Sequence, residues 1–86
     1  MHETSLVRDI VHRIEDLSRS TGSPVVRARI WLGALSHLSA AHFREHFAAE
    51  ARGTLAAGTQ LDIEVSDDAH DPHAQQVRLN SVDLAE

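Results

Sequence analysis

Cysteine and lysine are both absent from the 86 residues of this chain. Without cysteine, disulfide frameworks and thiolate zinc sites are excluded. No apolar run approaches the roughly 20 residues that a membrane-spanning helix needs. The opening Met-His-Glu-Thr-Ser also lacks the basic start and apolar stretch of a signal peptide. We therefore expect a soluble, cytoplasmic protein.

Positive charge is scarce as well. Eight arginines stand against 13 acidic residues, for a formal net charge of −5. Nucleic-acid backbones and anionic membrane surfaces attract clustered positive charge, so this balance argues against both as partners. The chain has no glycine-rich phosphate loop, no nucleophile motif and no convincing acid–base pair, and we expect that it is not an enzyme.

Histidine, by contrast, is plentiful for a chain of this size. The seven histidines are His2, His12, His37, His42, His46, His70 and His73. Imidazole is the commonest metal ligand in proteins, so the positions of these residues matter. The length predicts one domain. A domain this small buries only about 60% of the surface of its unfolded chain, so a stable partner or a homodimer would help it.

Two segments have the pattern of helices. Residues 5–21 place apolar side chains on one stripe with a period of 3.6 residues, and Gly22 is a suitable stop. Residues 40–52 are rich in alanine, with two phenylalanines one turn apart, and Gly53 suits the C-terminal cap. Two good N-cap residues precede this second helix, Ser36 and Ser39.

Three segments have the alternating pattern of strands: residues 25–32, 60–65 and 77–84. The alternation of the last one slips near Ser81, where a bulge would account for it. The polar segment 67–76 reads as a loop. A strand–helix–strand unit makes a right-handed crossover with parallel strands, and the last two strands most simply pair antiparallel. We predict an α+β fold of order α-β-α-β-β, with two helices packed on one face of a three-stranded mixed sheet.

The other face of the predicted sheet would be polar. Its side chains would be Arg27, Arg29, Trp31, Asp62, Glu64 and Arg78. Cross-strand ion pairs fit such a face. Trp31 has two interpretations there, an interface residue or a tryptophan half covered by arginine stems.

Four blocks of sequence carry a family resemblance. They are residues 1–6 (Met-His-Glu-Thr-Ser-Leu), 32–36 (Leu-Gly-Ala-Leu-Ser), Phe43 to Phe47 with Arg52 to Glu64, and 79–84 (Leu-Asn-Ser-Val-Asp-Leu). In this order they resemble the HypA/HybF family of hydrogenase and urease nickel metallochaperones. The resemblance implies a single HypA-like domain over residues 1–86 that binds nickel and helps to insert it into a nickel–iron hydrogenase. It also implies two partners, a GTPase maturation factor and the hydrogenase large subunit.

One departure from the family pattern is large. Family members carry a zinc module with two Cys-x-x-Cys pairs between the last two strands, where this chain has the loop 67–76. We therefore expect no zinc at a cysteine site. The departure also motivates an alternative function, a metal-independent interaction or scaffold subunit derived from the same fold.

The resemblance implies that nickel binds at Met1, His2 and Glu3, and the chemistry of these residues agrees. The free amine of Met1, the backbone nitrogen of His2 and its imidazole can all reach one ion, with little loss of chain entropy. As the family implies, the backbone nitrogen of Glu3 would complete a planar set of four nitrogens, which suits nickel(II) or copper(II). The arrangement requires that Met1 remains and that its amine is free.

The other histidines have weaker cases. His42 and His46, one helical turn apart, can chelate one ion, but we favour a solvated helix face. His70 and His73 lie among aspartates and would form a loop metal site in place of zinc, but we favour a polar hairpin connection. His37 follows a strand-end turn and is a candidate to complete the nickel shell.

Overall fold

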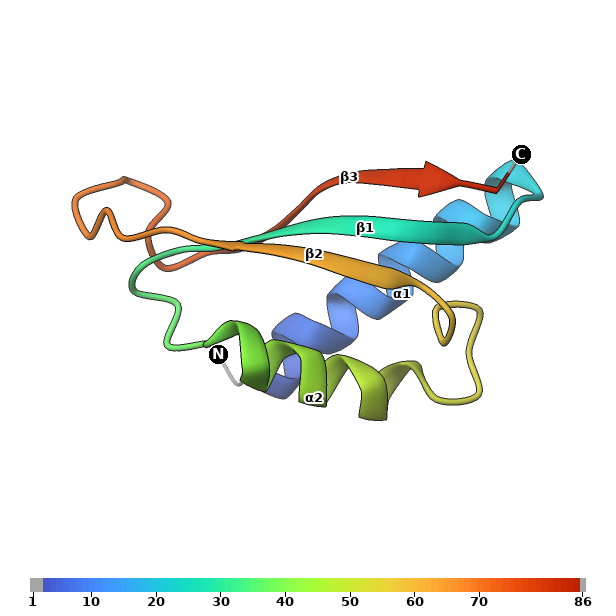
Figure 1. Cartoon of the computed structure of the whole chain (residues 1–86), viewed down its shortest axis with the longest axis horizontal. Coiled ribbons are helices and arrows are strands. Elements are labelled where there is room, and N and C mark those ends of the chain that lie inside the picture. The colour runs from blue at the N-terminus through green and yellow to red at the C-terminus, as the bar shows by residue number, and fades with distance from the viewer. Residues whose placement is uncertain (1–2, 86) are drawn as a thin grey trace.

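The computed structural model describes residues 3–85 and arranges them in two layers, a pair of helices against a three-stranded sheet (Figure 1). The elements in chain order are α1 (Glu3–Thr21), β1 (Val25–Leu32), α2 (Ala40–Ala51), β2 (Gln60–Val65) and β3 (Val77–Leu84). Both helices cover the same face of the sheet. The predicted architecture is confirmed. Within residues 3–85, no helix combines the length and the apolar character needed to cross a bilayer.

The first helix forms because its apolar side chains repeat with the helical period. Its buried apolar residues are Val7, Ile10, Val11 and Ile14. α1 begins at Glu3, two residues before the predicted start at residue 5. The apolar pattern did not reveal these two residues because both are polar. After Thr21, Gly22 adopts a φ of 71°, and its N–H donates to the Ser18 carbonyl at 3.0 Å. This left-handed residue ends the helix as predicted.

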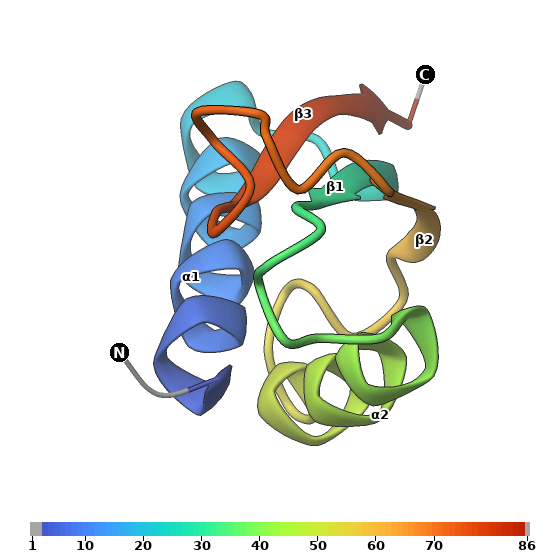
Figure 2. The same cartoon turned by 90° about the vertical axis from the view of Figure 1, so that its left-hand side faces the viewer.

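β1 is the central strand of the sheet, in the order β2-β1-β3. It pairs parallel with β2, as the strand–helix–strand unit predicts. The expected pairing of the last two strands with each other is wrong, because β3 pairs antiparallel with the other side of β1. β1 has the most deeply buried side chains of the three strands, and neighbours on both sides satisfy its backbone hydrogen-bonding groups. The segment 67–76 therefore crosses the end of β1 instead of closing a hairpin (Figure 2).

A bulge interrupts the pairing of β1 with β3. Arg29 pairs with Ser81, and the next residue of β1 pairs with Leu79. Asn80 is thus an extra residue on β3, which confirms the bulge predicted near Ser81. Because of it, Leu79 and Val82 both pack against the core although strict alternation would place them on opposite faces.

Ser39 starts the second helix. Its hydroxyl oxygen accepts a hydrogen bond from the His42 N–H at 3.1 Å, and its backbone is extended, as an N-cap requires. Of the two candidate caps, Ser39 is therefore the one used, and Ser36 belongs to the preceding turn. At the other end α2 stops at Ala51, and Gly53 with a φ of 76° provides the predicted left-handed residue.

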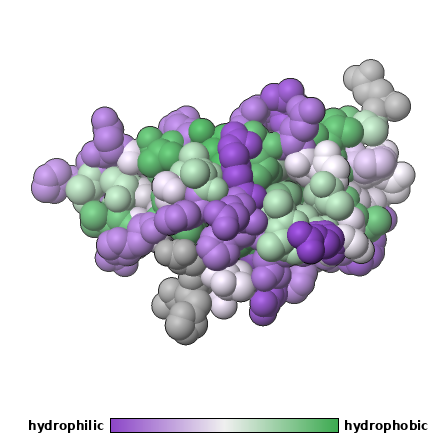
Figure 3. All heavy atoms as spheres, turned by 60° about the horizontal axis from the view of Figure 1, so that its bottom comes forward, coloured by the Kyte–Doolittle hydropathy of each residue, from purple (hydrophilic) through white to green (hydrophobic). Residues whose placement is uncertain are grey.

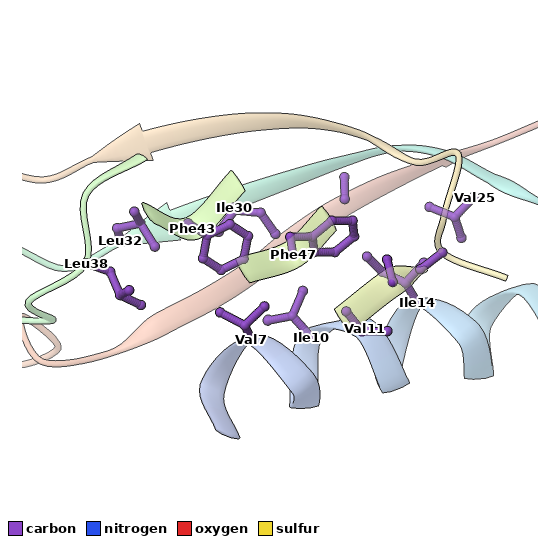
Figure 4. Packing of buried hydrophobic residues seen from close by; sticks show 13 residues of the cluster. Val7, Ile10, Val11, Ile14, Val25, Ile30, Leu32, Leu38, Phe43 and Phe47 are labelled. Carbon is purple, nitrogen blue, oxygen red and sulfur yellow. The ribbon is translucent and has the colours of Figure 1, made fainter. Parts of the chain in front are cut away.

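The hydrophobic core lies between the sheet and the two helices (Figure 4). Phe43 and Phe47 of α2 stack with ring centroids 6.1 Å apart and lie between side chains of β1 and α1. Phe43 and Leu32 are completely buried. Thr59, which precedes β2, donates its buried hydroxyl to the Val25 carbonyl at 2.7 Å. This hydrogen bond joins the starts of the two neighbouring parallel strands.

The sheet face away from the helices carries paired charges. Arg27 contacts Asp62 at 2.9 Å, and Arg29 contacts Asp83 at 2.9 Å. The cross-strand ion pairs predicted for this face are therefore present, although the alternation pattern did not single out Asp83. The hydrogen bond from Arg29 holds the pKa of the Asp83 carboxyl below its usual value. Trp31 is half-buried on this face, which agrees with both of its interpretations.

Candidate metal centre

Three segments that are distant in sequence meet at one end of the molecule, which Figure 2 views directly. They are the first turn of α1, the turn 33–38 that follows β1, and the loop 67–76 that precedes β3. α1 begins at Glu3, the last of the predicted nickel ligands. Met1, His2 and the side chain of Glu3 lie outside the described residues.

The start of α1 bears on the backbone nitrogen that is predicted to bind metal. The first four N–H groups of an α-helix have no acceptor within the helix. The N–H of Glu3 is the first of these in α1, so formation of the helix does not use it. A metal ion can displace the proton of this nitrogen without breaking a helical hydrogen bond. The predicted role of Glu3 is therefore compatible with the helix that begins there.

A tight turn leads from β1 toward α2 and carries His37. The Ser36 N–H donates to the Gly33 carbonyl at 3.0 Å, and the Leu38 N–H lies 3.5 Å from the Ser36 hydroxyl. Ser36 and Leu38 are buried, whereas His37 between them is exposed. With a φ of 63°, His37 is the only described residue other than glycine in the left-handed region. The turn thus presents an imidazole at the surface on an anchored backbone.

The loop 67–76 is docked onto this turn. The Gly33 N–H donates to the Gln76 carbonyl at 2.9 Å, and the Leu35 N–H donates to the Ala74 carbonyl at 2.7 Å. Ala74 is buried. A Cβ on Gly33 would lie within 3.0 Å of three backbone atoms of His73 and Ala74. Glycine is therefore needed at this position for the loop to approach, a role that the sequence pattern did not reveal.

Inside the loop, the aspartates shape the backbone. Asp68 accepts a hydrogen bond from the His70 N–H at 3.0 Å, and Asp71 accepts one from the His73 N–H at 2.7 Å. Such contacts are typical of Asx turns. Both histidines are exposed. The predicted hairpin connection is wrong, because β2 and β3 are not neighbours in the sheet. In the described part of the chain, no group of three or more histidine or acidic residues is arranged to hold a metal ion.

Three further histidines lie on the helices, His12 on α1 and His42 and His46 on α2. His12 and His42 are exposed, as a solvated helix face predicts. His46 departs from that prediction because it is half-buried. It precedes the buried ring of Phe47 by one residue, which places it at the border of the packed side of α2.

A hollow of about 310 Å³ opens beside His37. It is lined by Leu6 of α1, by Leu35, Ser36 and His37 of the turn, and by Gln75 of the loop. His37 and Leu6 line the same hollow, so His37 lies next to the first part of α1. The position of His37 after a strand-end turn pointed to this site, whereas Leu6 and Gln75 have no metal-binding signature in the sequence.

An ion pair links the two helices. The Arg8 Nε lies 3.2 Å from a carboxylate oxygen of Glu50, and this hydrogen bond raises the pKa of Arg8. Exposed ion pairs contribute little to stability. This one nevertheless helps to orient the first half of α1 against α2. On the helix-covered side of the molecule, hydrophilic side chains interrupt the apolar areas (Figure 3).

Comparisons with known sequences agree with the resemblance. Residues 1–71 match the family model described as "HypA: Hydrogenase/urease nickel incorporation, metallochaperone, hypA". The hydrogenase maturation factor HypA of Methylocella silvestris is 42% identical over 66 residues, which cover 76% of this chain and 58% of that protein. HypA of Acidithiobacillus ferrooxidans is 39% identical over 64 residues, covering 73% of this chain and 57% of that protein. This chain therefore spans little more than half the length of these relatives.

Solved structures share the fold. The solution structure of the Ni metallochaperone HypA from Helicobacter pylori has a TM-score of 0.78 at 18% identity, over 98% of this chain and 97% of that chain. A solution structure of a HypA protein has a TM-score of 0.76 at 18% identity, over 99% of this chain and 97% of that one. At this identity the likeness concerns the fold alone, and it confirms the predicted arrangement of helices and strands.

Proposed function

Because this chain belongs to the HypA family of hydrogenase and urease nickel-incorporation metallochaperones, we propose that it binds nickel and assists nickel insertion during maturation of a nickel–iron hydrogenase. The family match over residues 1–71 is the observation that carries this proposal. The relatives are named hydrogenase maturation factors, which favours a hydrogenase as the client. In this role the chain is a cytoplasmic binding protein and catalyses no reaction itself.

The nickel ligands we propose are the amine of Met1, the backbone nitrogen and imidazole of His2, and the backbone nitrogen of Glu3. Four nitrogens from consecutive residues favour the planar geometry that nickel(II) accepts. The start of α1 supports this set because it leaves the Glu3 N–H without a helical acceptor. The imidazole must be neutral to bind, so nickel affinity should weaken as the pH falls below about 6.5.

Delivery of nickel requires partners. We propose a GTPase maturation factor and the hydrogenase large subunit, with a homodimer as a further way to bury surface. Nucleic acid and membranes are not expected partners of a chain with a net charge of −5. Zinc at a cysteine site plays no part, since the chain has no cysteine. The loop 67–76 stands where family members carry the zinc module, and backbone hydrogen bonds to Gly33 and Leu35 hold it in place.

Calorimetric titration of the untagged protein with nickel tests the proposal. The unmodified protein should bind nickel tightly, and His2→Ala should lose this binding. His12→Ala is the matched control, because it removes an exposed imidazole from α1 and should leave the affinity unchanged. Extension of the N-terminus should abolish binding as His2→Ala does, because it blocks the amine.

Two results would contradict the proposal in different ways. Undiminished nickel affinity in His2→Ala would refute the ligand set. Failure of the unmodified protein to take up nickel would refute the nickel-binding function. If hydrogenase-maturation partners were nevertheless recovered in a pull-down, the metal-independent scaffold would be the better description.

A further inference from the structure

The sheet face away from the helices, here called the open face, is electrically balanced in a molecule that is otherwise acidic. Both helices lie on the other side of the sheet, so neither covers it (Figure 1). Its charged residues are Arg27, Arg29, Arg78, Asp62, Glu64 and Asp83. Their charges cancel, whereas the whole chain has a formal net charge of −5. Repulsion between two copies of the chain is therefore weak where two open faces approach each other.

Two of these six groups are left without an ion-pair partner. Two cross-strand ion pairs, each 2.9 Å long, use the other four. The remaining two are Glu64 on β2 and Arg78 on β3, and both are exposed. Within residues 3–85, neither of their side chains has a partner of opposite charge. The open face therefore keeps one negative and one positive charge available for a group outside the molecule.

Trp31 lies between these two charges. In the register of the sheet it is the partner of Glu64 on one side and of Arg78 on the other. Neighbouring strands are about 4.8 Å apart, so the two charged positions are roughly 10 Å apart with the half-buried indole between them. Tryptophan and arginine are among the residues that contribute most to the energy of protein interfaces. The three residues thus form a row of acid, aromatic ring and base across the sheet.

Such a row is complementary to a second copy of itself. A two-fold axis parallel to β1 and above Trp31 would place Glu64 of one copy opposite Arg78 of the other, and the reverse pair would form on the other side of the axis. The two indole rings would meet at the axis, where offset stacking is favourable. An axis across the strands would instead oppose like charges, which is destabilising. The charges therefore select one of the two arrangements.

We propose that two copies of this chain associate through their open faces, with Trp31 at the two-fold axis and Glu64 paired with Arg78 of the other copy. Arg27 and Arg29 do not oppose this contact because carboxylates within their own copy neutralise them. The inference assigns an interface to the proposed homodimer and does not depend on nickel binding.

The size of the open face sets the strength of this dimer. Three strands about 4.8 Å apart and eight residues of β1 at about 3.3 Å each give a face of roughly 26 by 14 Å. A footprint of about 360 Å² per copy is at the low end for specific interfaces, so the dimer is weak and forms only in concentrated solution.

Sedimentation velocity of the untagged protein, over a series of concentrations and without added metal, measures this association. Low ionic strength is needed because salt screens exposed ion pairs. The protein should change from monomer to dimer as its concentration rises. Trp31 is the only tryptophan of the chain, so its fluorescence reports directly on the open face. Its emission should shift to shorter wavelengths over the same concentration range, because the indole leaves water.

Charge reversal tests the predicted pairing. Glu64→Arg and Arg78→Glu each place two like-charge pairs in the symmetric dimer and should weaken it about tenfold or more. The first variant makes the net charge less negative and the second makes it more negative, so a loss in both cannot come from net charge. The double variant restores opposite charges across the axis and should dimerise like the unmodified protein.

Two further variants complete the design. Arg52→Glu is the matched control, because it reverses an exposed arginine at the end of α2, away from the open face, and should leave the dimer nearly unchanged. Trp31→Thr removes the ring, keeps a residue that suits a strand, and should abolish the dimer. Circular dichroism verifies that each variant is folded.

Three results would overturn the inference. The first is a protein that stays monomeric at every concentration, and the second is a dimer that neither single charge reversal weakens. The third is a double variant that associates no better than the single ones, since the two charges would then not face each other. None of these results bears on the nickel titration of the untagged protein, so the proposed function and this interface can fail independently.

Discussion

Replacing Gly33 with alanine should disrupt the end of the molecule where the loop crosses β1. The new Cβ would lie within 3.0 Å of three backbone atoms of His73 and Ala74, and backbone atoms cannot rotate away as a side chain would. The loop would have to retreat. Its retreat would separate the Leu35 N–H from the Ala74 carbonyl and the Gly33 N–H from the Gln76 carbonyl.

The magnitude follows from these contacts. Each of the two backbone hydrogen bonds contributes about 0.5 to 1.5 kcal/mol, and an overpacked position typically costs about 1 to 3 kcal/mol. We expect the free energy of unfolding to fall by roughly 3 kcal/mol. In a domain of this size each kcal/mol lowers the Tm by about 4 to 8 °C, so the Tm should fall by roughly 12 to 24 °C.

Thermal unfolding followed by circular dichroism measures this effect, with Gly58→Ala as the matched control. A Cβ on Gly58 would meet nothing within 4 Å, and its backbone is not left-handed. Alanine there should leave the Tm nearly unchanged or raise it slightly, because it restricts the unfolded chain. If Gly33→Ala melted within about 3 °C of Gly58→Ala, the docking of the loop on the turn would be refuted.

Three further predictions concern the helix cap, the open sheet face and the independence of the fold from metal. Ser39→Ala removes the N-cap oxygen of α2 and should lower the free energy of unfolding in urea by about 1 kcal/mol, whereas Ser39→Asp should retain it; equal losses in both variants would speak against the cap. Arg29 lowers the pKa of the Asp83 carboxyl in the folded state, so the unfolded state binds a proton at Asp83 more readily than the folded state does. The stabilisation by this pair is therefore complete above the usual aspartate pKa of about 3.9 and is lost as the pH falls through the folded pKa. Asp83→Asn should therefore lose less stability than the unmodified protein between neutral pH and about pH 3, and identical urea midpoints in the two proteins at both pH values would show that the pair has no such effect. A chelator should leave the Tm unchanged, because the chain has no cysteine for zinc and backbone hydrogen bonds hold the loop 67–76, and a lower Tm in the chelator would reveal a structural metal.

The helices and strands were predictable because their signals are local. Alternation in residues 25–32 and the helical stripe of residues 5–21 depend only on neighbours a few positions apart. The choice of partner for β3 was not predictable in this way, because it depends on the free side of a strand more than 40 residues earlier in the chain. Short loops usually join paired strands, and that general tendency led to the wrong hairpin.

The candidate site was predictable to a different extent. Its first three residues came from the family resemblance, with coordination chemistry that agrees. The anchoring of the turn that carries His37 was not predictable, since it depends on Gly33 leaving room for the backbone of Ala74, a residue about 40 positions later. A glycine at the end of a strand looks the same in sequence whether it merely ends the strand or admits another segment. The positive φ of His37 was equally hidden, because few residues other than glycine adopt that conformation and no local pattern marks those that do.

Stability at this end of the molecule and the proposed binding of nickel depend on different parts of the chain. Backbone hydrogen bonds and the burial of Ala74 hold the loop to the turn, and these contacts need no metal ion. The proposed ligands are the first three residues. A change at Gly33 therefore displaces the loop while it leaves those three residues intact. The nickel affinity of Gly33→Ala should equal that of the unmodified protein even though its Tm is lower, and a loss of affinity would show that the docked loop and turn contribute to the nickel site.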